Sequence, residues 1–548
     1  MRGASLLAAV VWLVGCSRSS GGGAAPDAGQ TVEIQLVSLS TWLGQLDPVS
    51  VTGADGGTQQ LGGLPALSAY FAQDRAANPN TVLLMSGDSF GADPPLASQF
   101  NDEPAVKALD FLGASADMLG NHNFDQGIPY LQNLIGLSTY PYVSTNMSDV
   151  QTVVSSSVVV PYTLVSVGGV QVGVLGITSQ DAPNHTTPGN FGAITIQEPT
   201  AAATAAAAQA RMAGAQVVVA LTDLETTGVG IAGTHTGPLM DFANAVTGVD
   251  VVLGYNQNSP GTPLAGTTLV VEHVWKGMTY GRTHVTLSGG AVVSTSAEVV
   301  TPDDSLVTPD PAAEALLAPY QMQLDARFDM KVSVASATFA LDGSERVEES
   351  ALGDLVADSM LAKYASGGAQ IAVMNGAGLR DSIPSSYAPG DMTLRRPMSG
   401  YAPGPPWDVV VGDPYTVLPF GDFCVVRPVT AAVLWQTLEQ SVFQIPASTD
   451  GFLQIAGFTF TYSASAAPGA RVQSVTLDDG TSLSRADTQT SVMLVDNDYI
   501  DHGGDDYGML IQDPPAPTRD VDAEVLLQYL QANPTLTPGT SKRITQLP

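Results

Sequence analysis

The sequence predicts an α/β protein built from two large domains. At 548 residues the chain is too long for one ordinary hydrophobic core, because domains usually contain roughly 100–200 residues. Hydrophobic residues make up 44% of the chain and charged residues 13%, which is typical of globular proteins. From about residue 32 to residue 300, short β-rich runs alternate with alanine-rich helical stretches, the order that builds an α/β layer.

The first part of the chain contains several predicted buried strands, each rich in valine, leucine or isoleucine. They are residues 32–39, 81–87, 170–178, 215–223 and 249–255. Residues 201–214, AAATAAAAQARMAG, are predicted to form a helix between two of these strands. Polar residues follow several of the strands, and in α/β folds binding sites lie at strand ends. We therefore expect the chemistry of this protein at these strand ends.

A proline- and aspartate-rich segment, TPDDSLVTPDP, predicts a domain boundary within residues 301–335. The residues that follow it, 312–328, have the pattern of a helix, and Pro319 is expected to interrupt that helix. The domain before this boundary is expected to span residues 31–300, and the domain after it residues 336–548.

The second domain is also predicted to be α/β. Residues 350–365 have the pattern of an amphipathic helix, and residues 369–384 predict a strand followed by a glycine-rich turn. Residues 395–408, RRPMSGYAPGPPWD, are predicted to form an inserted surface loop. Cys424 lies in an apolar context and is expected to be a buried, inert thiol.

The N-terminus has the pattern of an export signal. An apolar run from Leu6 to Val14 is shorter than the roughly 20 residues that a membrane-spanning helix needs. It ends in LVGC, which looks like a bacterial lipobox, so residues 1–16 are predicted to be a lipoprotein signal ending at lipidated Cys16. An unlipidated secretory signal is the alternative. Residues 17–30 have the composition of a flexible linker. These features predict a bacterial cell-envelope location, periplasmic or surface-exposed, with membrane attachment through the lipid only.

The charge balance limits the partners of this protein. The formal net charge is -32, from 52 acidic and 20 basic side chains. A field of this sign repels nucleic acid polymers and anionic lipid. A small anionic substrate would need a metal ion or a few well-placed arginines at its site. No pattern in the sequence specifies an oligomeric state.

Ten short motifs occur in a fixed order along the chain. They are VSLSTWLGQLDP, LLMSGDSFGADP, LGNHNFDQG, VVVALTDLETTG, VVLGYNQNS, ALGDLVADSM, MNGAGLRDSIP, VLPFGDF, GFLQIAGFTFTY and NDYIDHGGDDY. In this order they resemble the bacterial periplasmic and animal surface 5′-nucleotidase family. The resemblance implies an N-terminal four-layer αββα metallophosphatase sandwich and a C-terminal α/β domain that binds the nucleoside. It also implies two divalent ions that hold the phosphate and activate a water.

The resemblance assigns roles to individual residues of the first domain. Asp88 matches the carboxylate that bridges both ions, Asn121 matches an asparagine ligand, and Gln257 is compatible with a His-or-Gln ligand position. His122 matches a histidine that stabilises charge on the phosphate, and Asp125 matches the residue that orients it.

Four ligand positions of the family pattern are replaced in this sequence. Thr41 and Leu43 stand for an Asp-x-His pair, Asp223 stands for a histidine, and Tyr255 stands for another histidine. Leucine has no donor atom, and the hydroxyls are weak neutral donors. The remaining oxygen-rich set, which includes Asp223, suits Mg²⁺ or Mn²⁺ rather than zinc. We expect one divalent ion rather than two, with no ion as the alternative.

The resemblance assigns the nucleotide contacts to the second domain. Asn375 and Arg380 match residues that contact the nucleotide, and Asp505 matches an acid that contacts the ribose. Phe420 and Tyr499 match two aromatic residues that sandwich the base. Stacking of this kind contributes roughly 1–3 kcal/mol per base. Packing in a hydrophobic core is the alternative for either ring alone.

Three functions compete at this point. The first is an exported, lipid-anchored phosphoesterase that acts on nucleotides or related phosphoesters through a remodelled metal site. The second is a catalytically inactive family member that binds a nucleoside or another surface ligand. The third is a structural surface lipoprotein, in which Asp88, Asn121 and His122 only stabilise turns.

Overall fold

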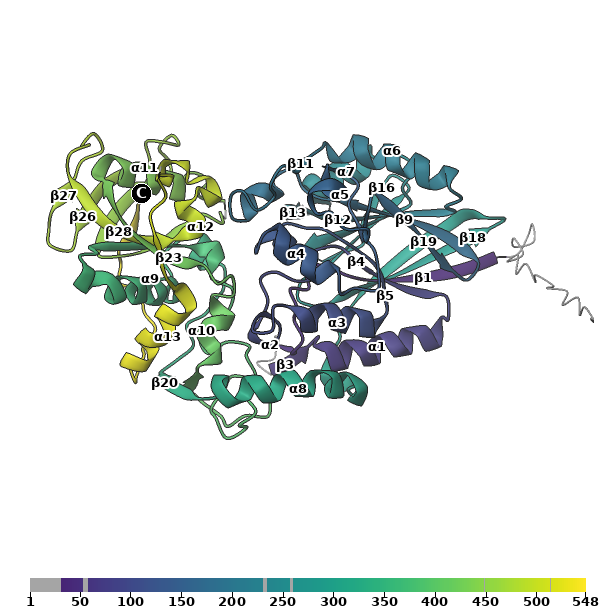
Figure 1. Ribbon diagram of the computed structural model, residues 1–548, viewed down its shortest axis with the longest axis horizontal. Coiled ribbons are helices and arrows are strands. Elements are labelled where there is room, and N and C mark those ends of the chain that lie inside the picture. Colours follow the sequence, from purple (N-terminus) through teal and green to yellow (C-terminus); the bar gives the residue numbers. More distant parts are fainter. Residues whose placement is uncertain (1–30, 53–57, 230–233, 257–259, 448, 513) are drawn as a thin grey trace, which may run out of the picture.

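The computed structural model describes residues 31–52, 58–229, 234–256, 260–447, 449–512 and 514–548. Its N-terminal half contains two β-sheets packed face to face (Figure 1). One sheet has seven strands in the order β19-β18-β1-β4-β5-β6-β8. These strands are β1 (Thr31–Leu39), β4 (Thr81–Met85), β5 (Ala114–Met118), β6 (Tyr142–Val143), β8 (Val159–Val160), β18 (Tyr280–Ser288) and β19 (Ala291–Val300).

The second sheet of this half has six strands in the order β16-β17-β15-β12-β10-β9. These strands are β9 (Tyr162–Val167), β10 (Val170–Ile177), β12 (Val217–Glu225), β15 (Val251–Asn256), β16 (Leu264–Ala265) and β17 (Thr268–Val274). The five strands predicted from the sequence are therefore present as β1, β4, β10, β12 and β15. They form because each carries a buried, β-branched or leucine-rich run.

Helices cover the outer face of each sheet. Helices α1 (Leu64–Ala77) and α3 (Glu103–Leu112) pack on the seven-stranded sheet, and α6 (Pro199–Met212) and α7 (Pro238–Ala245) pack on the six-stranded sheet. A separate apolar core, with Leu84 and Val219 among its members, fills the space between the two sheets. The half is thus a four-layer αββα sandwich, and this confirms the predicted architecture.

The parallel strands fix where the functional loops meet. β1, β4 and β5 are parallel neighbours, and β10, β12, β15 and β17 form a second parallel set. Because the carboxyl ends of parallel strands share one edge of a sheet, the loops at residues 40–44, 86–91 and 119–127 come together there.

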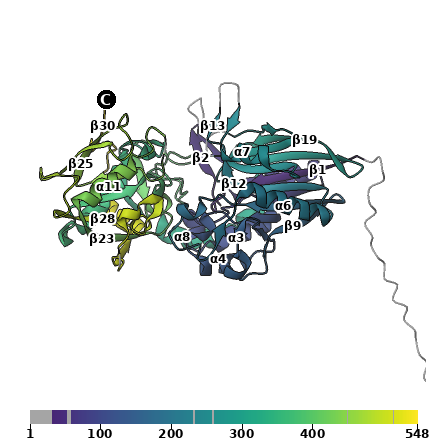
Figure 2. The ribbon, with the colours of Figure 1, turned by 90° about the horizontal axis from the view of Figure 1, so that it is seen from above.

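The C-terminal half lies beside the first half and contains two main sheets and a two-stranded sheet of β20 (Lys331–Ala335) and β22 (Trp407–Val410) (Figure 2). The five-stranded sheet has the order β24-β21-β28-β23-β29, and the four-stranded sheet has the order β27-β26-β25-β30. Their strands are β21 (Ile371–Asn375), β23 (Phe423–Thr430), β24 (Leu453–Ala456), β25 (Phe458–Ser463), β26 (Val472–Leu477), β27 (Ser482–Leu483), β28 (Ser491–Asn497), β29 (Thr518–Val521) and β30 (Ile544–Leu547). Alternate residues of β21 enter two different cores, one with Ile371 and Val373 and one with Ala372 and Met374.

The helix after the first half continues through its proline, contrary to expectation. Helix α8 (Pro311–Phe328) runs without a break past Pro319 and contacts α1 and α3. A proline inside a helix costs about 3 kcal/mol or more. Burial of Leu317, Leu324 and Phe328 on the first half offsets that cost.

Two further expectations for the second half are wrong in part. Helix α9 (Ala351–Tyr364) is not amphipathic in its first turns: residues 352–357 are all buried, because α9 packs against the five-stranded sheet and against α13 (Asp522–Ala532). The segment 395–408 is not simply a surface loop, because Arg396 is only 2% exposed and pairs with the buried Asp413. Cys424 is buried as predicted. Cys16 and the predicted signal and linker lie outside the described residues. None of the described helices has the length and apolar character needed to cross a membrane.

Candidate functional site

Asp88 stands at the centre of the strand-end loops. It follows β4 in left-handed backbone, with φ 49°, and its side chain is buried. The backbone N–H of Leu43 donates to the Asp88 carbonyl at 2.9 Å, and that of Thr41 donates to Gly87 at 3.0 Å. Oδ1 of Asp88 accepts the backbone N–H of His122 at 2.9 Å. Asp88 therefore connects three loops of the first half.

A second buried carboxyl, Asp117 at the end of β5, holds the Asp88 loop in place. It accepts from the backbone N–H of Gly87 at 3.3 Å and of Met118 at 2.7 Å, and from the Ser89 hydroxyl at 2.5 Å. Burial raises the pKa of Asp117 to about 7, against these three stabilising donors.

His122 and Asp125 form an oriented pair. Nδ1 of His122 lies 2.7 Å from Oδ2 of Asp125, and the other carboxylate oxygen accepts the Thr186 hydroxyl at 2.9 Å. Asn190 donates to the Asp125 carbonyl at 2.8 Å. With Nδ1 engaged, Nε2 is the ring nitrogen that a substrate would meet.

Asp223, near the end of β12, is a further acid of the site, and its side chain is partly buried. Its Oδ1 accepts the backbone N–H of Ser179 at 2.6 Å, while its Oδ2 is buried without a hydrogen-bond partner among the described residues. Burial raises the pKa of the Asp223 carboxyl well above its usual range, and the negative charge of Asp88 raises it further. Burial likewise raises the pKa of Asp88, with the His122 side chain acting in the opposite direction. The negative charge of Asp88 therefore disfavours the ionised form of Asp223, and a nearby cation would relieve this repulsion.

The remaining predicted ligands are less well placed. The side-chain amide of Asn121 donates to the His185 carbonyl at 3.1 Å. Gln257 lies outside the described residues.

The predicted nucleoside residues of the second half form a connected cluster. The Asn375 amide donates to Asp505 at 2.9 Å, and the Tyr499 hydroxyl lies 2.9 Å from the other Asp505 oxygen. Asn497 donates to Asn375 at 3.1 Å. Burial raises the pKa of Asp505 to about 6. The structure brings these three predicted residues together, with Asn497 as an additional member.

Phe420 and Arg380 face the first half across the domain interface. The Phe420 ring is roughly parallel to His122, with centroids 5.9 Å apart and an interplanar angle of 21°. The Arg380 guanidinium lies over the Phe420 ring at 5.5 Å and over the Trp275 ring at 5.2 Å. Phe420 thus lies beside the oriented histidine. A base sandwich between Phe420 and Tyr499 stays a prediction.

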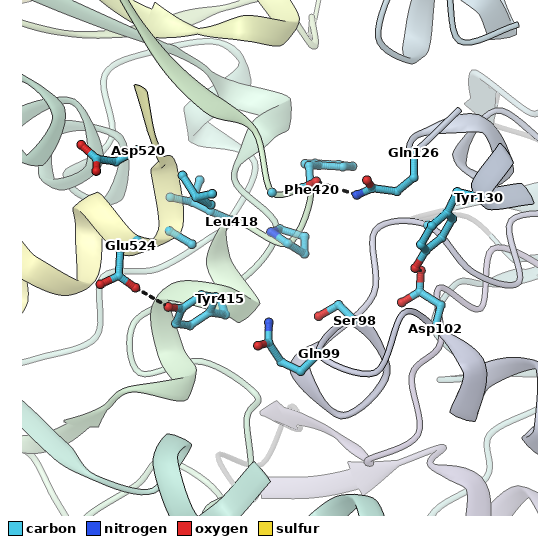
Figure 3. Close-up of a pocket in the computed structure, with 15 residues that line it drawn as sticks. Ser98, Gln99, Asp102, Gln126, Tyr130, Tyr415, Leu418, Phe420, Asp520 and Glu524 are labelled. Carbon is cyan, nitrogen blue, oxygen red and sulfur yellow. Dashed lines mark hydrogen bonds between the residues drawn. The ribbon is translucent and has the colours of Figure 1, made fainter. Parts of the chain in front are cut away.

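A pocket of about 400 Å³ also opens between the two halves. Figure 3 shows Gln126, Tyr130 and Asp102 on one side of it, and Leu418 and Tyr415 on the other. Gln126 donates to the Phe420 carbonyl at 3.1 Å, which is the dashed line in the upper part of the view. Phe420 lines this pocket. The hydrogen bond from Gln126 therefore ties the Phe420 backbone to the first half.

Comparison with known proteins identifies the second half. Residues 331–512 match the model of the 5'-nucleotidase C-terminal domain. The whole chain superposes on a 5'-nucleotidase precursor from Thermus thermophilus with a TM-score of 0.79 and 26% identity, covering 94% of this chain and 99% of that one. Residues 331–512 thus match the 5'-nucleotidase C-terminal domain, and the chain as a whole resembles proteins of the 5′-nucleotidase family. This confirms the family resemblance drawn from the ten motifs.

The chain also resembles other proteins in sequence over most of its length. It is 25% identical to the cell wall protein Lmo0130 of Listeria monocytogenes, over 94% of this chain and 69% of that protein. It is also 25% identical to the protein UshA of Yersinia enterocolitica, over 84% of this chain and 85% of that protein. Two Bacillus subtilis relatives are much longer, and the match spans 39% and 30% of their lengths.

The side chains of the first half fit one of the two implied ion positions better than the other. At the first position Leu43 offers no donor and is completely buried, and Thr41 offers only a hydroxyl. At the second, Asp88 and Asp223 supply oxygens, and the unpartnered Oδ2 of Asp223 is the kind of atom that a cation satisfies. No group of three or more His, Cys, Asp or Glu side chains within the described ranges is arranged to hold a metal. The first position does not fit an ion, and the second would hold one through Asp88, Asp223 and Asn121.

Sequence reasoning missed the residues of the domain contact. His185 lies 3.0 Å from Asp181 within the first half and 3.5 Å from Asp450 of the second. The Tyr499 hydroxyl lies 3.0 Å from the Asn184 carbonyl. No motif marks Asn184, His185 or Asp450, because their contacts with the other half join segments hundreds of positions apart. The scarcity of histidine, 6 in the chain, was the one available signal.

The His185 contact is expected to weaken at alkaline pH. The hydrogen bond to Asp181, with the charge of Asp450, raises the pKa of His185 to about 9 from an ordinary 6.5. Because the folded-state pKa is the higher one, this stabilisation is fully present below pH 6.5 and is lost as the pH rises through about 9. NMR titration of histidine-labelled protein should show this pKa, and Asp181→Asn should move it towards 6.5. A value near 6.5 in the wild type would contradict the prediction.

Proposed function

We propose that this chain hydrolyses the phosphate ester of nucleotides or related phosphoesters. One observation carries the proposal: His122, oriented by Asp125, lies directly against Phe420 of the 5'-nucleotidase C-terminal domain. A nucleoside held by the second half would therefore present its phosphate to the histidine of the first half.

The residues of the site divide the chemistry between them. His122 stabilises negative charge on the phosphoryl oxygens or on the leaving group through Nε2, while Asp125 keeps the ring in position. Asp505 and Asn375 orient the sugar, and Arg380 attracts the anionic group into an otherwise acidic protein. A divalent ion bound at Asp88, Asp223 and Asn121 would supply Lewis-acid charge and an activated water.

Backbone strain around Asp88 supports a functional role for the loops. Thr41, Leu43 and Asp88 all have left-handed φ values, of 43°, 51° and 49°. Left-handed backbone in residues other than glycine costs about 1–3 kcal/mol each and persists where the surrounding structure enforces it. Strain of this kind concentrates at active sites.

Phosphate release from a panel of nucleotides tests this proposal. Protein that begins after Cys16 is assayed with Mg²⁺, Mn²⁺, Co²⁺ or Zn²⁺, and metal-dependent release that disappears in Asp88→Asn is the expected result. Asp250→Asn is the matched control, because Asp250 pairs with Arg211 just before β15, at the opposite strand ends. Absence of release above the Asp88→Asn level with every metal would overturn the proposal.

A second candidate is a 5′-nucleotidase family member that binds nucleosides without turnover. The buried, donor-free Leu43 at a ligand position favours it, because a two-ion mechanism has no place for that side chain. Adenosine binding by calorimetry, together with no phosphate release, would select this candidate. Absence of both would favour a structural surface lipoprotein.

We further propose that the protein is held at the cell envelope by a lipid on Cys16. The LVGC pattern and the likeness to a cell wall protein support this location. Cys16→Ser should release the protein from the membrane fraction and abolish incorporation of labelled fatty acid. Retention of the variant in that fraction would contradict the proposal.

A further inference from the structure

Arg380 is a buried cation without a full set of partners. It is 8% exposed, its Nε has no hydrogen-bond partner among the described residues, and Nη1 reaches the Ala377 carbonyl only at 3.5 Å. Burying a guanidinium in this way costs free energy unless a negative group arrives to pair with it. A planar guanidinium binds phosphate through two parallel hydrogen bonds.

Trp275 of the first half positions this arginine. It follows β17 directly, and its ring centroid lies 5.2 Å from the Arg380 guanidinium, which also lies 5.5 Å from the Phe420 ring centroid. The aromatic face of tryptophan attracts a cation more strongly than that of phenylalanine or tyrosine. Arg380 therefore belongs to the second half but is held by a residue of the first.

The next residue, Lys276, connects this contact with the altered metal loop. Its backbone N–H donates to the Thr41 carbonyl at 3.0 Å, and its Nζ lies 3.4 Å from the Arg380 carbonyl. The backbone of Arg380 is thus held beside the loop in which Thr41 and Leu43 stand at ion-ligand positions.

We propose that Arg380, positioned by Trp275, takes the electrostatic place of the first metal ion in holding the phosphoryl group. The proposal rests on the proposed phosphoester substrate. The guanidinium supplies positive charge to a site in which Thr41 and Leu43 offer an ion few donors. A guanidinium does not activate water, so this site holds the anion and leaves water activation to the second position.

Calorimetry with inorganic phosphate in excess EDTA tests the proposal without requiring turnover. The wild-type protein should bind phosphate, and Arg380→Gln should abolish binding. Trp275→Leu should weaken the phosphate affinity about tenfold, whereas Trp275→Phe should keep it within about threefold because a cation–π partner is retained. The adenosine affinity of both Trp275 variants should match the wild type, which excludes general misfolding. After dialysis against Mn²⁺, mass spectrometry should find no more than about one ion per chain.

Three results would overturn the inference. The first is that the wild-type protein does not bind phosphate in EDTA. The second is that Trp275→Leu binds phosphate as tightly as the wild type. The third is that each chain holds two tightly bound ions. Failure of the proposed function gives a different result, namely phosphate binding in EDTA with no release from any nucleotide. Release that requires two ions would instead keep the proposed function and reject the role of Arg380.

Discussion

Replacing His122 with asparagine is expected to lower kcat for phosphate release by about 10²–10⁴-fold, with a much smaller change in KM. The imidazole is bonded to Asp125 at 2.7 Å through Nδ1, so its second nitrogen is the one that would stabilise charge as it develops on the phosphate. Asparagine can still bond to Asp125 but cannot carry the positive charge. Steady-state kinetics on the preferred nucleotide provides the measurement.

His284→Asn is the matched control for this prediction. His284 lies on β18 and pairs with the half-exposed Glu33 across the sheet, so the same chemical change there should leave kcat within about twofold. Asp125→Asn should give an intermediate loss, because the ring stays but loses its charged orienting partner. An unchanged kcat in His122→Asn would mean that GNHNFD only stabilises a turn in this chain.

The sandwich of the first half was predictable because its signal is local. β12 begins with the apolar run VVVAL, and β10 is rich in valine and leucine; such runs in a parallel sheet are buried on both faces. The errors arose where packing with distant segments decides the outcome. Pro319 stays inside α8 because the flanking helix face is buried, and no property of the proline itself indicates this.

The candidate site shows the same division between local and distant information. The GNHNFD loop contains both His122 and Asp125 within four residues, so its hydrogen bond follows from spacing alone. The contact of Arg380 with Trp275 joins the two halves of the chain, and no pattern in either segment indicates the other. A single sequence therefore identifies the motif but not the side chains that complete it from the other domain.

Breaking the buried ion pair between Asp413 and Arg396 is expected to produce the largest loss of stability. Both side chains are fully buried, and the two guanidinium nitrogens lie 2.7 and 2.8 Å from the two carboxylate oxygens. Asp413→Asn would leave the arginine charge unpaired, which costs roughly 3–5 kcal/mol. Urea unfolding followed by tryptophan fluorescence should show the transition midpoint displaced accordingly.

Arg395→Gln breaks a partly exposed ion pair, so it shows how much of the stability loss comes from burial of the pair rather than from the charge alone. The adjacent Arg395 pairs with Asp408 at 2.5 Å, but its side chain is 32% exposed, so its loss should cost no more than about 1 kcal/mol. Equal midpoints for Arg395→Gln and Asp413→Asn would contradict the prediction. The double replacement Arg396→Met with Asp413→Leu should recover part of the loss, since no charge is then left buried.

The same pair connects stability to the nucleoside site. Asp413 lies in the first turn of α10 (Gly412–Val417), which leads directly into Pro419 and Phe420. Asp413 also accepts from the backbone N–H groups of Ser385 and Val410, both at 2.8 Å, so its charge fixes the start of this helix. Loosening α10 should let Phe420 move relative to His122. Asp413→Asn is therefore expected to weaken adenosine binding under conditions where the variant is still folded, whereas Arg395→Gln should not. Equal adenosine affinities in the two variants would show that the position of Phe420 depends on its contact with Gln126 rather than on α10.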